Sequence, residues 1–182
     1  MSRNISFTAS IINIKSVKIV RLPKNVSERL SSRGLVMVKL TINGYSFLTT
    51  LEPDGYGSHW FRLDQDVFSS FKPGDTVEII LEPSNDWTEV EVPVDLKLAL
   101  STDSKAEAMF NKITPMARWE WVRWIRATNK EETRARRIGV ALSKLKAGSR
   151  RPCCFNSSAC TDFSVSRNGK LAEPTGTIIN KA

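Results

Sequence analysis

The chain has few of the residues on which many enzyme and metal sites depend. Among its 182 residues there are one histidine, His59, and three cysteines. Cys153, Cys154 and Cys160 are odd in number and clustered near the C-terminus, which argues against a disulfide framework. No second Cys-x-x-Cys pair and no neighbouring histidine accompany them. We therefore assign no metal site and no cofactor.

Long apolar runs are missing as well. No stretch approaches the roughly 20 apolar residues that a membrane-spanning helix needs. The first ten residues also lack the charged and apolar regions of a secretory signal. We therefore expect a cytoplasmic protein without a transmembrane segment. A hydrophobic content of 41% is ordinary for a globular chain, and this length suffices for one good core or two small ones.

Charge is present in quantity but is unevenly distributed. Residues 1–98 carry 11 Lys and Arg against 12 Asp and Glu, whereas residues 99–182 carry 16 against 7. The formal net charge of +8 thus comes from the second part of the chain. A cationic region of this kind indicates an anionic macromolecule or a protein as partner, and nucleic acid is one candidate.

The first half alternates between apolar and polar residues, as β-strands do. Residues 36–42 and 45–51 alternate on the two sides of Asn43-Gly44, a dipeptide that favours a tight hairpin turn. Further strands are predicted at residues 5–14, 17–20, 60–63 and 77–81, and short helices at residues 23–31 and 64–71. Six short strands with tight turns predict a small β-barrel over residues 1–92.

Helical signals begin after residue 93, with helices predicted at 94–100, 104–110, 115–127 and 129–147. Asn129 and Glu132 have the spacing of a capping box, and Gly148 is placed to end the last helix. We predict a basic helical domain over residues 93–149, which makes the fold class α+β. No apolar periodicity remains beyond it, so residues 150–182 are expected to form a flexible, cysteine-containing tail.

The last predicted helix supplies the first candidate docking residues. Lys130, Arg137 and Lys144 recur every seven residues and would form a basic ridge beside the apolar arc of that helix. Arg134 lies between ridge and arc. It either joins the docking surface or is a partly buried guanidinium bonded to a carboxylate or to carbonyls. Arg136 is expected to pair with Glu132 at i, i+4.

The preceding helix supplies the second set. Trp119 lies four residues before Arg123 and seven before Arg126, on one polar side of that helix. An indole flanked by two guanidiniums can stack on a base or sugar ring, or it can be covered by those arginines. Trp121 and Ile125 fall on the opposite face and are predicted core residues.

His59, Trp60 and Arg62 are the candidate lining of a small-molecule or enzymatic cleft. A Ser or Cys nucleophile needs a base within hydrogen-bond reach, and His59 is the only histidine that could serve. We favour a structural role for His59 in the barrel or a loop. No catalytic residue is assigned, and the enzyme hypothesis ranks behind the two binding hypotheses.

Two stretches together resemble known bacterial domains. Residues 35–51, the loop 53–57 and residues 72–77 resemble a barrel domain of unknown function that is similar in fold to the double-split barrel of the swapped-hairpin transition-state regulators. Trp124-Ile125, followed by residues 130–138 (Lys-Glu-Glu-Thr-Arg-Ala-Arg-Arg-Ile), resembles the signature of the bacteriocin-protection, YdeI/OmpD-associated family.

These resemblances imply a function and a quaternary structure. The second family implies a role in stress resistance, namely tolerance of envelope-active or cationic peptides, and it implies no catalytic residues. The swapped-hairpin likeness implies a homodimer. The leading hypothesis is thus a non-catalytic binding protein that docks its partner through basic helices, and the alternative is a nucleic-acid-binding regulator.

Overall fold

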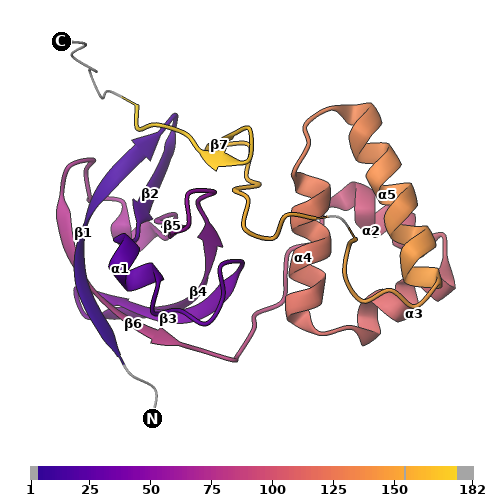
Figure 1. The fold of residues 1–182 in the computed structure, drawn as a ribbon, viewed down its shortest axis with the longest axis horizontal. Helices are drawn as coiled ribbons and strands as arrows, with labels where there is room; N and C mark the ends of the chain where they lie inside the picture. The colour runs from indigo at the N-terminus through magenta and orange to yellow at the C-terminus, as the bar shows by residue number, and fades with distance from the viewer. Residues whose placement is uncertain (1–3, 154, 176–182) are drawn as a thin grey trace. The chain divides into compact units, whose positions relative to one another are not determined.

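The computed structural model describes residues 4–153 and 155–175 of the chain. They divide into two compact units, which Figure 1 shows as strands and helices, respectively. The barrel unit comprises residues up to 86 together with 157–160 and 164–175. The helical unit comprises residues 87–156, apart from 154, and 161–163.

Six strands of the barrel unit form a closed antiparallel barrel in the order β1-β2-β5-β4-β3-β6. The strands are β1 (Ile5–Ile14), β2 (Val17–Arg21), β3 (Val36–Ile42), β4 (Tyr45–Pro53), β5 (His59–Arg62) and β6 (Thr76–Pro83). The predicted six-stranded barrel and the α+β class are confirmed.

Strand β3 illustrates how alternating apolar residues form the core of this barrel. Val36, Val38, Leu40 and Ile42 are buried in the core, whereas Lys39 between them is exposed. At the end of β3 the chain turns through Asn43 and Gly44, whose φ angles are 49° and 81°. Both lie in the left-handed region that a two-residue hairpin turn requires, so the predicted β3–β4 hairpin is confirmed.

Two short helical elements accompany the strands and are shorter than predicted. Helix α1 spans Lys24–Ser27 and the 3₁₀ turn η1 spans Asp66–Phe68. The side chain of Phe68 is 2% exposed and lies within 6 Å, centroid to centroid, of the rings of Tyr45, Phe47 and Phe71. The 3₁₀ turn thus places an aromatic side chain in the barrel core.

The helical unit contains α2 (Val94–Ser101), α3 (Ser104–Lys112), α4 (Pro115–Arg126) and α5 (Glu131–Lys146). The predicted core residues Trp121 and Ile125 are 1% and 0% exposed. The Thr114 hydroxyl caps α4 by accepting a hydrogen bond from the Ala117 amide. None of the described helices combines the length and the apolar content that crossing a membrane requires.

The start of α5 differs from the prediction. Its N-cap residue is Lys130, which makes no side-chain capping bond, so the predicted Asn129–Glu132 capping box is wrong. The Thr128 hydroxyl instead accepts a hydrogen bond from the Lys130 amide at 3.3 Å. The C-terminal end agrees with the prediction, because Gly148 has φ +85° and its amide bonds to the Leu145 carbonyl at 2.9 Å.

The prediction of a tail without regular structure is wrong for the part of residues 157–175 that joins the barrel unit. Strands β7 (Ser166–Arg167) and β8 (Lys170–Leu171) form a hairpin. Cys160, Val165 and Leu171 are buried against Ile14, Ile19 and Trp60 in a second apolar cluster of the barrel unit. These apolar residues are too widely spaced to show a period. Cys153 is exposed, and Cys154 and residues 176–182 lie outside the described residues.

Burial of Leu171 predicts a stability effect that a flexible tail would not have. Leu171 is 4% exposed, and Leu171→Ala should lower the free energy of unfolding by about 2–3 kcal/mol, measured by urea denaturation. Leu48 is 43% exposed, and Leu48→Ala should change it by less than about 0.5 kcal/mol. Equal effects of the two substitutions would contradict the packing of this segment on the barrel.

Candidate functional site

The predicted basic ridge on α5 is exposed at its two ends and anchored at its centre. Lys130 and Lys144 are exposed. Arg137 between them is half-buried, and its Nη1 donates a hydrogen bond to the Trp124 carbonyl at 2.6 Å. Its guanidinium lies 5.5 Å from the centre of the Trp124 ring. Burial, and secondarily the neighbouring Arg136, lower the pKa of Arg137.

Arg134 forms an ion pair within the helical unit. Its Nε and Nη2 donate to the two carboxylate oxygens of Asp95 on α2 at 2.5 and 2.9 Å, and Nη1 lies 3.4 Å from the Ile125 carbonyl. Of the two predicted roles of Arg134, the structure therefore shows the partly buried guanidinium bonded to a carboxylate. The bidentate contact joins α5 to α2 and lowers the pKa of Asp95, chiefly through the hydrogen bonds from Arg134.

The α4 candidates also make contacts inside the helical unit. Trp119 Nε1 donates to the Thr88 carbonyl at 2.8 Å, and Arg126 Nη2 donates to the Glu91 carbonyl at 3.0 Å. Both bonds hold the segment that leads into α2. Arg123 is only 2% exposed, and its guanidinium lies 5.4 Å from the centre of the Phe155 ring. Trp119, Arg123 and Arg126 thus make contacts within the helical unit, and stacking of Trp119 on a base or sugar ring stays a prediction.

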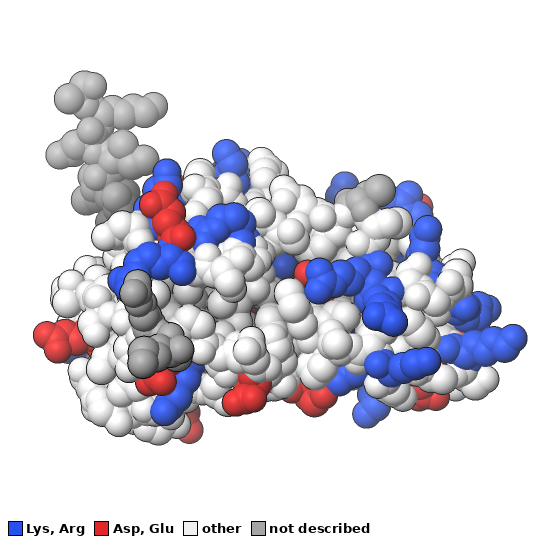
Figure 2. All heavy atoms as spheres, turned by 60° about the horizontal axis from the view of Figure 1, so that its bottom comes forward, with Lys and Arg blue, Asp and Glu red and all other residues white. Residues whose placement is uncertain are grey.

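The exposed cations of α5 include one residue that the sequence reasoning treated as structural. Arg136 is exposed and has no carboxylate within 4.0 Å among the described residues, so the expected pair with Glu132 is not formed. Figure 2 shows Lys and Arg side chains gathered over the helical unit. Of the predicted docking residues on α5, Lys130 and Lys144 are exposed. Arg136 is exposed as well, but at about 100° per residue it projects from another side of the helix.

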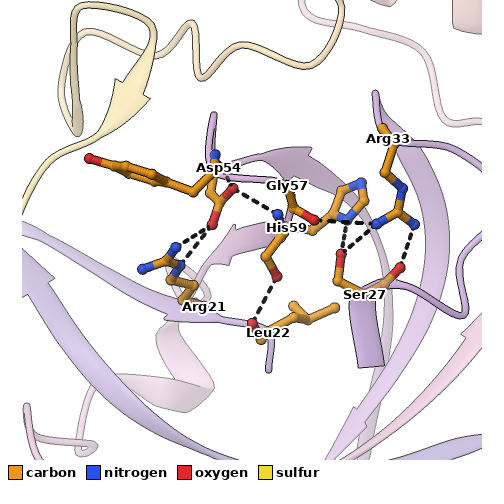
Figure 3. Close-up of polar contacts among 9 residues, drawn as sticks. Arg21, Leu22, Ser27, Arg33, Asp54, Gly57 and His59 are labelled. Atoms are coloured by element: carbon orange, nitrogen blue, oxygen red, sulfur yellow. Dashed lines mark hydrogen bonds and ion pairs between the residues drawn. The ribbon is translucent and has the colours of Figure 1, made fainter. Parts of the chain in front are cut away.

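His59 is the centre of a buried polar network in the barrel unit (Figure 3). Its side chain is 0% exposed. Nε2 lies 2.8 Å from the Gly34 carbonyl, which can only accept, so Nε2 carries the proton. Nδ1 then accepts from the Ser27 hydroxyl at 2.7 Å, and that oxygen accepts in turn from Arg33 Nη1 at 3.2 Å.

The burial of this network bears on the predicted cleft lined by His59, Trp60 and Arg62. A Ser–His pair at 2.7 Å has the spacing of an activated nucleophile, yet a side chain that is 0% exposed cannot reach a substrate. Trp60 is 1% exposed, and Arg62 donates to the Ser164 hydroxyl of the C-terminal segment at 2.5 Å. His59 and Trp60 are thus too deeply buried to line an open pocket, and Arg62 makes its hydrogen bond within the barrel unit.

The loop that precedes His59 presents an exposed aromatic side chain. The fully buried Asp54 accepts hydrogen bonds through Oδ1 from the Tyr56 and Ser58 amides, at 2.7 and 2.9 Å. Through Oδ2 it accepts from Arg21 Nε at 2.7 Å (Figure 3). Tyr56 itself is 48% exposed. The buried carboxylate therefore organises the loop whose tip is Tyr56.

The C-terminal hairpin contacts this loop closely. The Leu171 amide donates to the Asp54 carbonyl at 2.8 Å. Gly55 has φ +77°, and a Cβ placed there would lie 2.3 Å from the Gly169 carbonyl oxygen. Only glycine fits such an approach. The loop Pro53–Gly57 thus packs directly against the β7–β8 hairpin, and sequence patterns do not reveal this contact.

Comparison with known proteins agrees with this architecture, a closed antiparallel barrel followed by a helical domain. Residues 7–81 match the model of a domain of unknown function (DUF1905), and residues 89–148 match the family described as Bacteriocin-protection, YdeI or OmpD-Associated. The two matches follow each other along the chain in the order that the sequence resemblance predicted. No curated protein matches the chain.

The close packing of the β7–β8 hairpin against Gly55 can be tested with a matched pair of substitutions. Gly55→Ala and Gly57→Ala both place an alanine at positive φ, +77° and +89°, but only the Cβ at residue 55 meets neighbouring atoms. Gly55→Ala should therefore cost about 1–3 kcal/mol more unfolding free energy than Gly57→Ala. Amide hydrogen exchange should also become faster in residues 166–171. Equal costs would show that the hairpin does not rest on this loop.

The Asp95–Arg134 pair predicts a pH dependence. Because the pKa of Asp95 is lowered from 3.8, its carboxylate stabilises the fold above that pH, and this contribution is lost as the pH falls through the lowered value. Asp95→Asn should reduce the unfolding free energy at pH 7 by up to about 1 kcal/mol, and the two proteins should converge in acid. Glu91→Gln, which removes an exposed carboxylate nearby, is the control and should have no such effect.

Proposed function

We propose that this protein is a non-catalytic, cytoplasmic binding protein that contributes to bacteriocin protection by docking an anionic partner along one side of α5. The match of residues 89–148 to the bacteriocin-protection family supports the general role. The observation that carries the docking surface is the exposure of Lys130 and Lys144 without a carboxylate within 4.0 Å among the described residues.

Charge balance within each unit supports the same assignment. The described residues of the helical unit carry 14 Lys and Arg against 9 Asp and Glu, whereas those of the barrel unit carry 11 against 10. Ion pairs such as Arg118–Glu89 and Lys146–Asp103 join residues that both belong to the helical unit. Surplus positive charge therefore stays with the helical unit.

The length of the surface indicates the kind of partner. Lys130 and Lys144 are 14 residues apart, which corresponds to about 21 Å along a helix. Cations distributed over such a distance suit an extended acidic surface of a protein better than a single small anion. Exposed Glu131 and Glu132 at the start of the helix repel any anion, but a protein surface can present cations to them, whereas a phosphate backbone offers only negative charge. For this reason we place an acidic protein before nucleic acid.

Charge reversal of the accessible ridge tests the proposal. Full-length protein carrying Lys130→Glu and Lys144→Glu should bind poly-glutamate about tenfold more weakly than the unmodified chain, measured by fluorescence anisotropy at physiological salt. The same substitutions should abolish the survival advantage of bacteria that express the protein during bacteriocin challenge.

The matched control is Lys39→Glu with Lys72→Glu, which changes the net charge equally at exposed barrel positions. It should weaken binding less than about twofold. Equal losses of poly-glutamate affinity in the two double variants would refute the docking role of Lys130 and Lys144. Tighter binding of duplex DNA than of poly-glutamate, with a steep salt dependence, would favour the nucleic-acid alternative. Light scattering of the same samples measures the homodimer expected from the swapped-hairpin likeness.

A further inference from the structure

The barrel unit has an open groove beside Tyr56 that neither matched domain description explains. Its volume is about 840 Å³, within the range of roughly 300–1,000 Å³ that small-molecule sites occupy. The end of β1, the Tyr56 loop and the β7–β8 hairpin form its walls, so residues far apart in the chain meet there. All of its lining residues belong to the barrel unit.

Positive charge predominates in the groove. Lys15, Arg167 and Lys170 line it, against one carboxylate, that of Glu173. Lys170 Nζ lies 5.0 Å from the centre of the Tyr56 ring, and the Arg21 guanidinium lies 5.3 Å from the same centre. Lys15, Arg167 and Lys170 come from two different segments and line one groove, although the barrel unit as a whole is nearly neutral.

The remaining lining is suited to an organic group. Tyr56 supplies an aromatic ring and a hydroxyl, and Ala172 supplies half-exposed apolar surface, while the almost fully buried Ile14 and Leu171 lie behind them. A smaller groove of about 470 Å³ shares Tyr56 and adds Arg21 and Lys24. Tyr56 thus borders two hollows that both contain cations.

Rigid support distinguishes this groove from a chance group of surface lysines. The Tyr56 loop is held by the buried Asp54, and the hairpin is held by Leu171, which is 4% exposed. The hairpin turn at Asn168 and Gly169 has φ angles of 53° and 75°, which sets Arg167 and Lys170 on the two sides of a tight turn. The cations are therefore presented by elements with fixed backbones.

We propose that the Tyr56 groove binds a small molecule that carries a phosphate group. Lys15, Arg167 and Lys170 contact the phosphate, because a dianion best compensates several converging cations. The apolar and aromatic lining contacts the organic part. The site belongs to the barrel unit and does not depend on the docking function proposed for α5.

The test is an amide NMR titration of the full chain with phenyl phosphate, compared with inorganic phosphate and with phenol. Phenyl phosphate should bind more tightly than either fragment, with shifts concentrated at residues 14–15, 55–57 and 166–173. Arg167→Gln with Lys170→Gln should weaken binding about tenfold. Lys39→Gln with Lys72→Gln removes the same charge from exposed barrel positions and should change it less than about twofold.

Several results would overturn the proposal. One is the absence of chemical-shift changes in the groove at about 10 mM phenyl phosphate, because the dissociation constant would then lie well above that concentration. Equal weakening in the two double variants would be another. If inorganic phosphate binds as tightly as phenyl phosphate, the proposed contact between the groove and an organic part of the ligand is refuted. The Lys130→Glu, Lys144→Glu variant should bind phenyl phosphate normally, which separates this site from the function proposed for α5.

Discussion

The arrangement of the barrel's exposed loop depends on the buried carboxylate of Asp54. A carboxylate that is removed from water must be compensated by hydrogen bonds and opposite charge. Asp54 receives both, from the amides of Tyr56 and Ser58 and from Arg21, while its carbonyl accepts from Leu171. One residue thereby couples strand β2, the Tyr56 loop and the C-terminal hairpin. The Tyr56 loop and the C-terminal hairpin, two of the three walls of the groove beside Tyr56, are held together in this way.

The same requirement explains the use of arginine in the helical unit. A guanidinium with five donors can satisfy several carbonyls or a carboxylate at once. Arg118 and Arg134 do so, and Arg126 holds the segment before α2 through a single carbonyl, that of Glu91. Lysines such as Lys130 and Lys144, whose charge sits at the end of a flexible chain, remain at the surface. Net charge therefore overstates the cationic surface that is accessible to a partner.

The two proposed surfaces recognise anions in different ways. The side of α5 is an extended row of flexible cations, which suits long-range attraction to an acidic macromolecule and should be sensitive to salt. The Tyr56 groove is concave, aromatic and apolar at its lining, which suits a compact ligand with a defined shape. Each surface lies within one unit, so each can be tested without disturbing the other.

Local patterns in the sequence determined the strands, the Asn43-Gly44 turn, the helical domain and their order, because alternation, turn residues and helix periodicity act over a few neighbouring residues. They also identified which residues are cationic. Tertiary structure decided which of those cations are accessible, since Arg134 and Arg137 found partners 39 and 13 residues away. It also decided that His59 is buried, and that residues near 170 pack on Ile14 and Asp54. Such contacts depend on distant segments meeting in space, and no local pattern encodes them.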